Sequence, residues 1–115
     1  MKAKVIKVTE GGIEFDNGYK LYSSHDSDCC ESHELTFTDI TVKDFEGLEF
    51  DLTNEKFFNK IIDYGIELVP LKGYSVKIPG HGYNNGYYGT NLDLVIHDGI
   101  KETVYDITEC QVIQD

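Results

Sequence analysis

The strongest constraint on this chain is a period of two in its apolar residues, which recurs on both sides of short polar turns. Alternation of this kind puts apolar side chains on one face of a β-strand and polar side chains on the other. It also lets strand pairing be tested, because a turn of the right length must bring apolar residues opposite one another. The chain is therefore expected to fold mainly as antiparallel β-sheet.

The first 23 residues predict a three-stranded meander. A loop over residues 16–18, with Gly18 in the left-handed region, matches the apolar rows better than a two-residue Asn-Gly loop. A tight turn at Glu10 and Gly11 extends the same rows upstream. The predicted opposite pairs are Phe15 with Tyr19, Ile13 with Leu21, Glu14 with Lys20, Val8 with Ile13, and Ile6 with Phe15.

The second half of the chain predicts another meander. Its turns are a three-residue loop at 84–86 and a turn of about four residues at 98–101. Between the meanders, residues 34–39 alternate again, and residues 39–47 predict a turn or one short helical turn. The predicted pairs are Tyr83 with Tyr87, Ile78 with Leu92, Val76 with Leu94, Tyr74 with Ile96, Ile96 with Thr103, Leu94 with Tyr105, and Leu92 with Ile107.

One segment, residues 54–64, carries a helical pattern. Asn54 is a suitable N-cap and Gly65 a suitable left-handed stop. The apolar stripe between them has i, i+3, i+4 spacing and consists of Phe57, Phe58, Ile61 and Ile62. The predicted fold class is α+β, predominantly antiparallel β, with two β-meanders and one amphipathic helix packed on a sheet face. A chain of 115 residues affords one hydrophobic core, so residues 1–115 are expected to form a single globular domain.

The charge of the chain argues against several classes of partner. Ten basic residues, all lysine, stand against 21 carboxylates, which gives a net charge of -11. Such a field repels nucleic acid and acidic lipid, so we expect a protein partner, no nucleic acid and no membrane. An acidic mimic of nucleic acid remains a minor alternative. The N-terminus lacks the apolar run of a signal peptide, so the expected location is cytoplasmic.

The densest polar cluster covers residues 23–33. His25, Cys29 and His33 recur at intervals of four, which would bring them within reach of one ion only if the segment turns. The candidate metal ligands are His25, Asp28, Cys29, Cys30 and His33.

Three readings of this cluster stay open. The first is a structural corner with one buried cysteine and capping carboxylates. The second is a transition-metal site, for which zinc is the expected ion if any cofactor is bound. The third is redox or nucleophilic use of Cys29 or Cys30, which the neighbouring carboxylates disfavour by raising a thiol pKa. A calcium loop of the EF-hand type is excluded, because Cys30 and Glu31 stand where an oxygen ligand and a glycine are required. Cys110, in contrast, is expected to be a small core residue.

A second cluster, residues 79–89, combines glycine with aromatic side chains. It has no phosphate-loop spacing and contains no lysine. Cross-strand aromatic stabilisation is one interpretation, and a recognition surface is the other, because tyrosine offers a large contact area at low entropic cost. The candidate partner-binding residues are His81, Tyr83, Tyr87 and Tyr88.

The chain resembles a family of small uncharacterised phage and prophage-associated proteins. The resemblance is carried by residues 22–31, which read Tyr-Ser-Ser-His-Asp-Ser-Asp-Cys-Cys-Glu, by residues 44–48, and by the Asn-Gly-Tyr-Tyr block at 85–88. It covers about residues 5–107, and Gly89 stands where the family usually has serine. It implies a phage or mobile-element origin but no activity.

Two functions follow as hypotheses. The first is a non-enzymatic binding or accessory domain of a phage or mobile element, which presents the tyrosine cluster. The second is a zinc-type metal-binding protein that uses the cluster at residues 25–33. No paired carboxylates, catalytic triad or cofactor fingerprint point to an enzyme.

Overall fold

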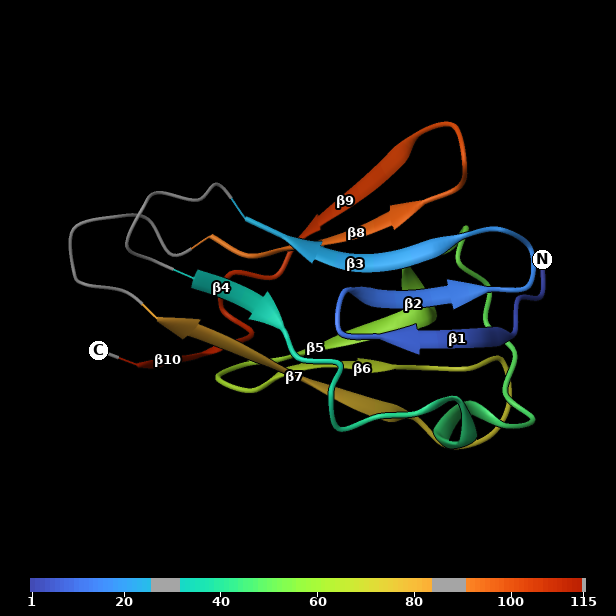
Figure 1. The fold of residues 1–115 in the computed structure, drawn as a ribbon, viewed down its shortest axis with the longest axis horizontal. Coiled ribbons are helices and arrows are strands. Elements are labelled where there is room, and N and C mark those ends of the chain that lie inside the picture. Colours follow the sequence, from blue (N-terminus) through green and yellow to red (C-terminus); the bar gives the residue numbers. More distant parts are fainter. Residues whose placement is uncertain (26–31, 84–90, 115) are drawn as a thin grey trace.

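The fold is known from a computed structural model, which describes residues 1–25, 32–83 and 91–114. Within these ranges, ten strands and two short 3-10 helices follow one another (Figure 1). Their bounds are β1 Val5–Thr9, β2 Gly12–Phe15, β3 Lys20–Ser24, β4 Ser32–Leu35, η1 Val42–Phe45, η2 Glu55–Phe57, β5 Phe58–Ile61, β6 Gly65–Leu68, β7 Val76–Tyr83, β8 Asp93–His97, β9 Glu102–Asp106 and β10 Val112–Gln114.

The described strands form two sheets. One has the strand order β1-β2-β3-β8-β9, and the other has the order β10-β7-β6-β5, with β4 also paired to β7. All pairings among the named strands are antiparallel except that of β10 with β7. The prediction of a mainly antiparallel β fold is therefore confirmed. The two described helices have four and three residues, and no described helix has the length and apolarity needed to cross a bilayer.

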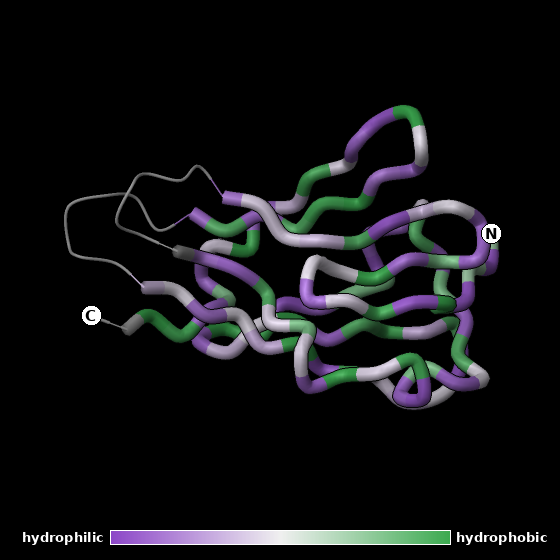
Figure 2. The backbone as a smooth tube through the Cα atoms, viewed as in Figure 1, coloured by the Kyte–Doolittle hydropathy of each residue, from purple (hydrophilic) through white to green (hydrophobic). Residues whose placement is uncertain are grey.

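The inner faces of the two sheets share one hydrophobic core. The period of two produces it directly: along β7, buried and less buried residues alternate from Val76 to Tyr83. The same alternation of hydrophobic and hydrophilic residues is visible along several strands in Figure 2. At one side of the core the sheets meet through aromatic rings, because Tyr105 of β9 contacts Phe57 and Phe58 edge to face. The largest fully buried side chains are Phe15, Phe50, Ile13, Leu21, Leu35, Ile66, Leu68, Ile78, Leu92, Leu94, Ile107 and Val95.

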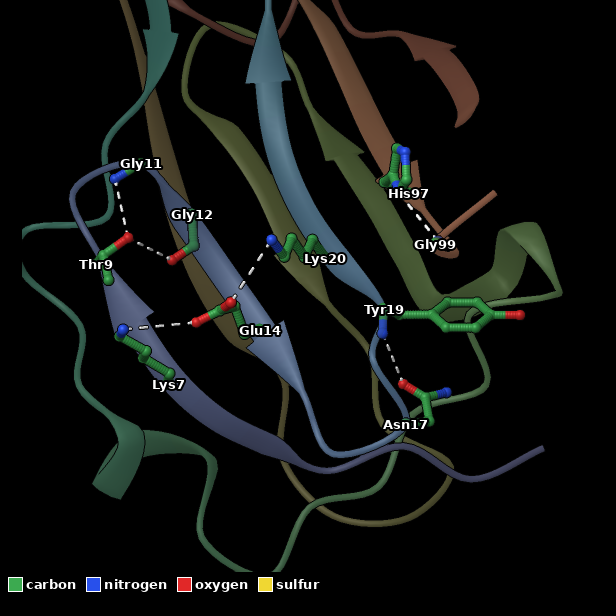
Figure 3. A network of polar contacts seen from close by, with 10 residues as sticks. All are labelled: Lys7, Thr9, Gly11, Gly12, Glu14, Asn17, Tyr19, Lys20, His97 and Gly99. Atoms are coloured by element: carbon green, nitrogen blue, oxygen red, sulfur yellow. Dashed lines mark hydrogen bonds and ion pairs between the residues drawn. The ribbon is translucent and has the colours of Figure 1, made fainter. Parts of the chain in front are cut away.

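The first meander has the predicted register with one exception. Ile13 lies opposite Leu21, Glu14 opposite Lys20 and Val8 opposite Ile13, and Gly18 has a φ of 88°. In addition, Phe15 donates its N–H to the carbonyl of Tyr19 across the three-residue loop. Figure 3 shows Lys7 and Lys20 on either side of Glu14, with a cross-strand ion pair of 3.8 Å to each.

The exception is Ile6, which was predicted to lie opposite Phe15. A β-bulge between Val5 and Lys7 places Val5 opposite Phe15 instead, so Val5 is buried and Ile6 is exposed. Before the bulge, the carbonyl of Lys4 accepts the N–H of Asp16, and Ala3 exchanges two backbone hydrogen bonds with Phe50. A bulge moves the register by one residue, and the turn sequence carries no signal of it.

The predicted helix at residues 54–64 is wrong. Asn54 does cap, accepting from the Lys56 N–H, but it caps only the 3-10 turn η2. The chain then continues as β5, which forms a hairpin with β6 through residues 62–64, where Asp63 has a φ of 60°. An isolated helix of this length is marginal in water, so pairing with β6 and packing on Tyr105 override the helical pattern.

The predicted pairing of β7 with β8 is also wrong. Ile78 lies opposite Ile66 of β6, whereas Leu94 lies opposite Ser23 of β3, so the two strands belong to different sheets. Any two strands with period-two apolar rows can be matched, so the match alone did not identify the partner. The turn after β8 is as predicted, since Ile96 lies opposite Thr103 and Leu94 opposite Tyr105. Ile107 donates its N–H to the carbonyl of Leu92, in line with the third predicted pair.

Candidate functional site

The polar cluster of residues 23–33 begins in a strand of one sheet and ends in a strand of the other. β3 of the first sheet ends at Ser24 and β4 of the second sheet begins at Ser32. The hydroxyl of Ser23 accepts the N–H of Leu35 at 3.0 Å, which joins the two strands. In Figure 1 the end of β3, the start of β4 and the end of β7 all lie toward the left.

His25 and His33 lie side by side at this end. Their ring centroids are 4.9 Å apart and the rings meet edge to face at 74°. Nδ1 of His25 is buried and has no hydrogen-bond partner among the residues that the structure describes. His33 is 3 % exposed, which is unusual for a histidine. The two histidines are eight residues apart in the sequence, and the end of β3 and the start of β4 bring their rings together.

His33 is held from the side of β10. Its Nδ1 lies 2.7 Å from Oε1 of Gln111, a residue that is also 3 % exposed. Nε2 of Gln111 donates in turn to the carbonyl of Thr108 at 2.8 Å. Burying such polar groups is costly unless they are hydrogen-bonded, so this contact lowers the cost of burying His33.

The backbone beside this pair is Gly82 of β7, which lies directly opposite His33. A Cβ at Gly82 would overlap Nδ1 of His33, and it would come within 2.5 Å of Oε1 of Gln111 and 2.7 Å of Cδ1 of Ile113. Only glycine leaves room for the imidazole and the amide against the strand. β7 is therefore shaped to hold this pair.

The turn that carries Thr108 is fixed by Asp106. Oδ1 of Asp106 accepts both the hydroxyl of Thr108 at 2.6 Å and its N–H at 3.0 Å. Both hydrogen bonds lower the pKa of the Asp106 carboxyl, and the one from the Thr108 side chain has the larger effect. The Thr108 hydroxyl also accepts the N–H of Leu92 at 3.2 Å, which ties the turn to the start of β8.

The predicted metal ligands divide into two groups. His25 and His33 are brought together, whereas Asp28, Cys29 and Cys30 lie outside the described residues. Within the described ranges, no group of three or more His, Cys, Asp or Glu side chains is arranged to hold an ion. The histidine pair is the portion of the predicted site that the structure assembles.

The predicted partner-binding residues divide in the same way, because Tyr87 and Tyr88 lie outside the described residues. His81 and Tyr83 are exposed on the face of β7 opposite to Gly82, and Tyr83 is 54 % exposed. With Ile78 in the last apolar row, the sequence predicts that residues 80–89 extend past the core with little left to bury, and for the described residues 80–83 this prediction is wrong. β4 pairs with them along one edge and β10 along the other, since both strands are in register with His81.

Sequence reasoning missed Gln111 as a site residue. It lies 78 positions after its partner His33, and a lone glutamine beside Cys110 carries no local signal. The prediction for Cys110 itself is confirmed, since it is a fully buried free thiol. Burial is the main cause that raises its pKa.

Comparisons with protein-family models, with curated proteins and with solved structures found no match to this chain.

Proposed function

We propose that this protein binds a divalent transition-metal ion, of which zinc is the expected one, through the imidazoles of His25 and His33. The observation that carries the proposal is their convergence, with ring centroids 4.9 Å apart. Two imidazoles on one tetrahedral ion, with metal–nitrogen bonds of about 2.0–2.1 Å, have centroids about 5 Å apart.

Burial supports the same proposal. Nδ1 of His25 is a buried nitrogen without a hydrogen-bond partner in the described part of the chain. A buried polar atom of that kind costs roughly 1–3 kcal/mol, and coordination of an ion would remove the penalty. The sequence supplies three more donor residues between the two histidines, namely Asp28, Cys29 and Cys30.

The main competing explanation is a structural aromatic pair. Edge-to-face rings with centroids about 4.5–7 Å apart are common in protein cores, and a pair of this kind needs no ion. That arrangement would leave Nδ1 of His25 with its desolvation cost, which is why we favour the metal.

The test is elemental analysis of untagged protein purified without a chelator. We expect about one zinc ion per chain, and loss of that zinc in the His25→Ala variant. His81→Ala is the matched control. His33 lies opposite Gly82 of β7, and His81 is on the other face of that strand. Protein without bound zinc that also fails to develop the visible spectrum of tetrahedral Co²⁺ on titration would contradict the proposal.

A second candidate is a binding or accessory domain of a phage or mobile element, without enzymatic activity. It is favoured by the exposed pair His81 and Tyr83 on the outer face of β7. The resemblance to phage-associated proteins points the same way. This candidate would become the leading one if the untagged protein bound no metal.

A further inference from the structure

The orientation of the Gln111 amide is fixed by its own hydrogen bond. Nε2 of Gln111 donates to the carbonyl oxygen of Thr108 at 2.8 Å. A carbonyl can only accept, so the atom that faces it must be the NH₂ group. The atom of Gln111 that faces His33 is therefore the acceptor Oε1, at 2.7 Å from Nδ1.

This orientation determines where the proton of His33 lies. An acceptor oxygen at hydrogen-bond distance requires that Nδ1 carry the hydrogen. In the neutral imidazole, Nε2 is then the ring nitrogen that carries no hydrogen, and its lone pair is the one that can bind a metal ion. We infer that Gln111 is a positioning residue that holds His33 as the Nδ1–H tautomer and so makes Nε2 its metal-binding nitrogen.

The metal-binding role of Nε2 rests on the proposed function, but the tautomer of His33 does not. Metal-binding histidines generally donate their other ring N–H to a protein oxygen, which fixes the ring and increases the basicity of the ligand. Here that oxygen belongs to a neutral amide. A neutral imidazole donor suits a borderline ion such as Zn²⁺ or Co²⁺ and not the hard ions Ca²⁺ and Mg²⁺.

The support for Gln111 extends through the turn behind it. Thr108, whose carbonyl orients the amide, is itself held by Asp106 and by the N–H of Leu92. Gly82 keeps the space in which the amide and the imidazole meet. The C-terminal segment thus acts on His33 from a distance of 78 residues in the sequence.

The experiment is nitrogen-15 NMR of the imidazole rings in the full chain after treatment with a chelator. We expect His33 to show a protonated Nδ1 and an unprotonated Nε2 in the metal-free protein. The Gln111→Ala variant should lose this tautomer, while Gln111→Glu should keep it, because a carboxylate oxygen also accepts from Nδ1 even though the donor to the Thr108 carbonyl is lost. Circular dichroism of both variants checks that each remains folded.

Titration with Co²⁺ provides the second readout. We expect Gln111→Ala to weaken binding by about 10–100-fold, the usual effect of losing such a supporting contact, and Gln111→Glu to weaken it less, because the acceptor for Nδ1 is kept and only the donor to the Thr108 carbonyl is lost. A protonated Nε2 on His33 in the unmodified chain, or an unchanged tautomer in Gln111→Ala, would overturn the inference. If the tautomer is as inferred but the unmodified chain binds neither Zn²⁺ nor Co²⁺, the positioning role stands and the proposed function fails.

Discussion

At the scale of the residue, the geometry of the candidate site depends on single atoms. Gly82 is tolerated there because it has no Cβ, and Gln111 is placed there because its amide satisfies a buried imidazole. Neither residue type is conspicuous in the sequence. The fold places both residues beside His33, and that contact gives each of them its role.

Cys110 shows how burial affects a titratable group. Its thiol is fully buried, and desolvation is the main cause that raises its pKa above the ordinary value of 9.0, with Glu109 adding to the rise. The native state therefore holds a proton that the unfolded chain releases first. The resulting stability is fully present below the ordinary pKa and is lost as the pH rises through the native pKa.

The first prediction is a pH dependence of stability. We expect the free energy of unfolding of the chelator-treated protein to fall as the pH is raised above about 8.5–9. In Cys110→Ala the fall should be shallower, although removing the thiol should itself cost on the order of 1 kcal/mol at pH 7. Denaturant titrations between pH 7 and pH 10 measure both effects.

The comparison isolates Cys110 from the tyrosines. Burial also raises the pKa of Tyr105, whose ordinary value is 10.0, but that residue is present in both proteins. The contribution of Tyr105 cancels when the free energy of unfolding of Cys110→Ala is subtracted from that of the unmodified chain at each pH. Parallel pH curves for Cys110→Ala and the unmodified chain would contradict the prediction.

At the scale of secondary-structure elements, β5 has the sequence pattern of a helix but folds as a strand paired with β6. The carbonyl of Phe57 accepts the N–H of Val69, so hydrogen-bonded pairs alternate from there along the hairpin. Asn59, opposite Glu67, then directs its backbone N–H toward β6. Lys60, opposite Ile66, directs its N–H to the outer edge.

The second prediction uses this alternation. Asn59→Pro should destabilise the protein by about 1–3 kcal/mol, because it removes a donor from the β5–β6 ladder and leaves an acceptor unsatisfied. Lys60→Pro should cost clearly less, because proline is tolerated where the N–H faces the outer edge of an edge strand. Thermal or denaturant unfolding of the two variants gives the comparison.

A helix at this place would give another result. Both substitutions would fall in its interior and each would cost about 3 kcal/mol or more. Equal and large losses in Asn59→Pro and Lys60→Pro would therefore contradict the hairpin. Lys60→Ala is the control for loss of the 3.1 Å ion pair with Glu109, whose two partners are both substantially exposed.

At the scale of the whole molecule, the net charge of -11 is spread over a single chain of 115 residues. The described ion pairs involve exposed side chains, and pairs of that kind contribute little. The remaining carboxylates repel one another in the folded state more than in the expanded one. Electrostatics should therefore oppose folding at low ionic strength.

The third prediction concerns salt. Raising NaCl from about 0.01 M to 0.15 M shortens the screening length from about 30 Å to about 8 Å, which is less than the size of the molecule. We expect the free energy of unfolding to rise on the order of 1 kcal/mol, or roughly 3–6 °C in Tm. Calorimetry over a salt series measures the shift. The same series in KCl is the control for ion-specific effects, and a Tm that stayed constant or fell would contradict the prediction.

The sequence by itself determined the alternating strands β1, β2, β3, β8 and β9 and the tight turns after β1, β2 and β8. Period two in the apolar residues requires a sheet with one buried face, and the lengths of the loops at 16–18 and 98–101 set the register of two hairpins. These are local effects, because the turn and its flanking residues contain all the information. The candidate pair His25 and His33 was also found from the sequence, through residue type and spacing.

Only the tertiary structure decided which strands became neighbours and what surrounds His33. The pairing of β3 with β8, the strand formed by residues 58–61 and the contact with Gln111 all depend on packing between segments far apart in the chain. Hydrophobic burial is non-directional, so matched apolar rows accept several partners with similar energy. The choice among them is made by the core as a whole, and no local pattern can state it.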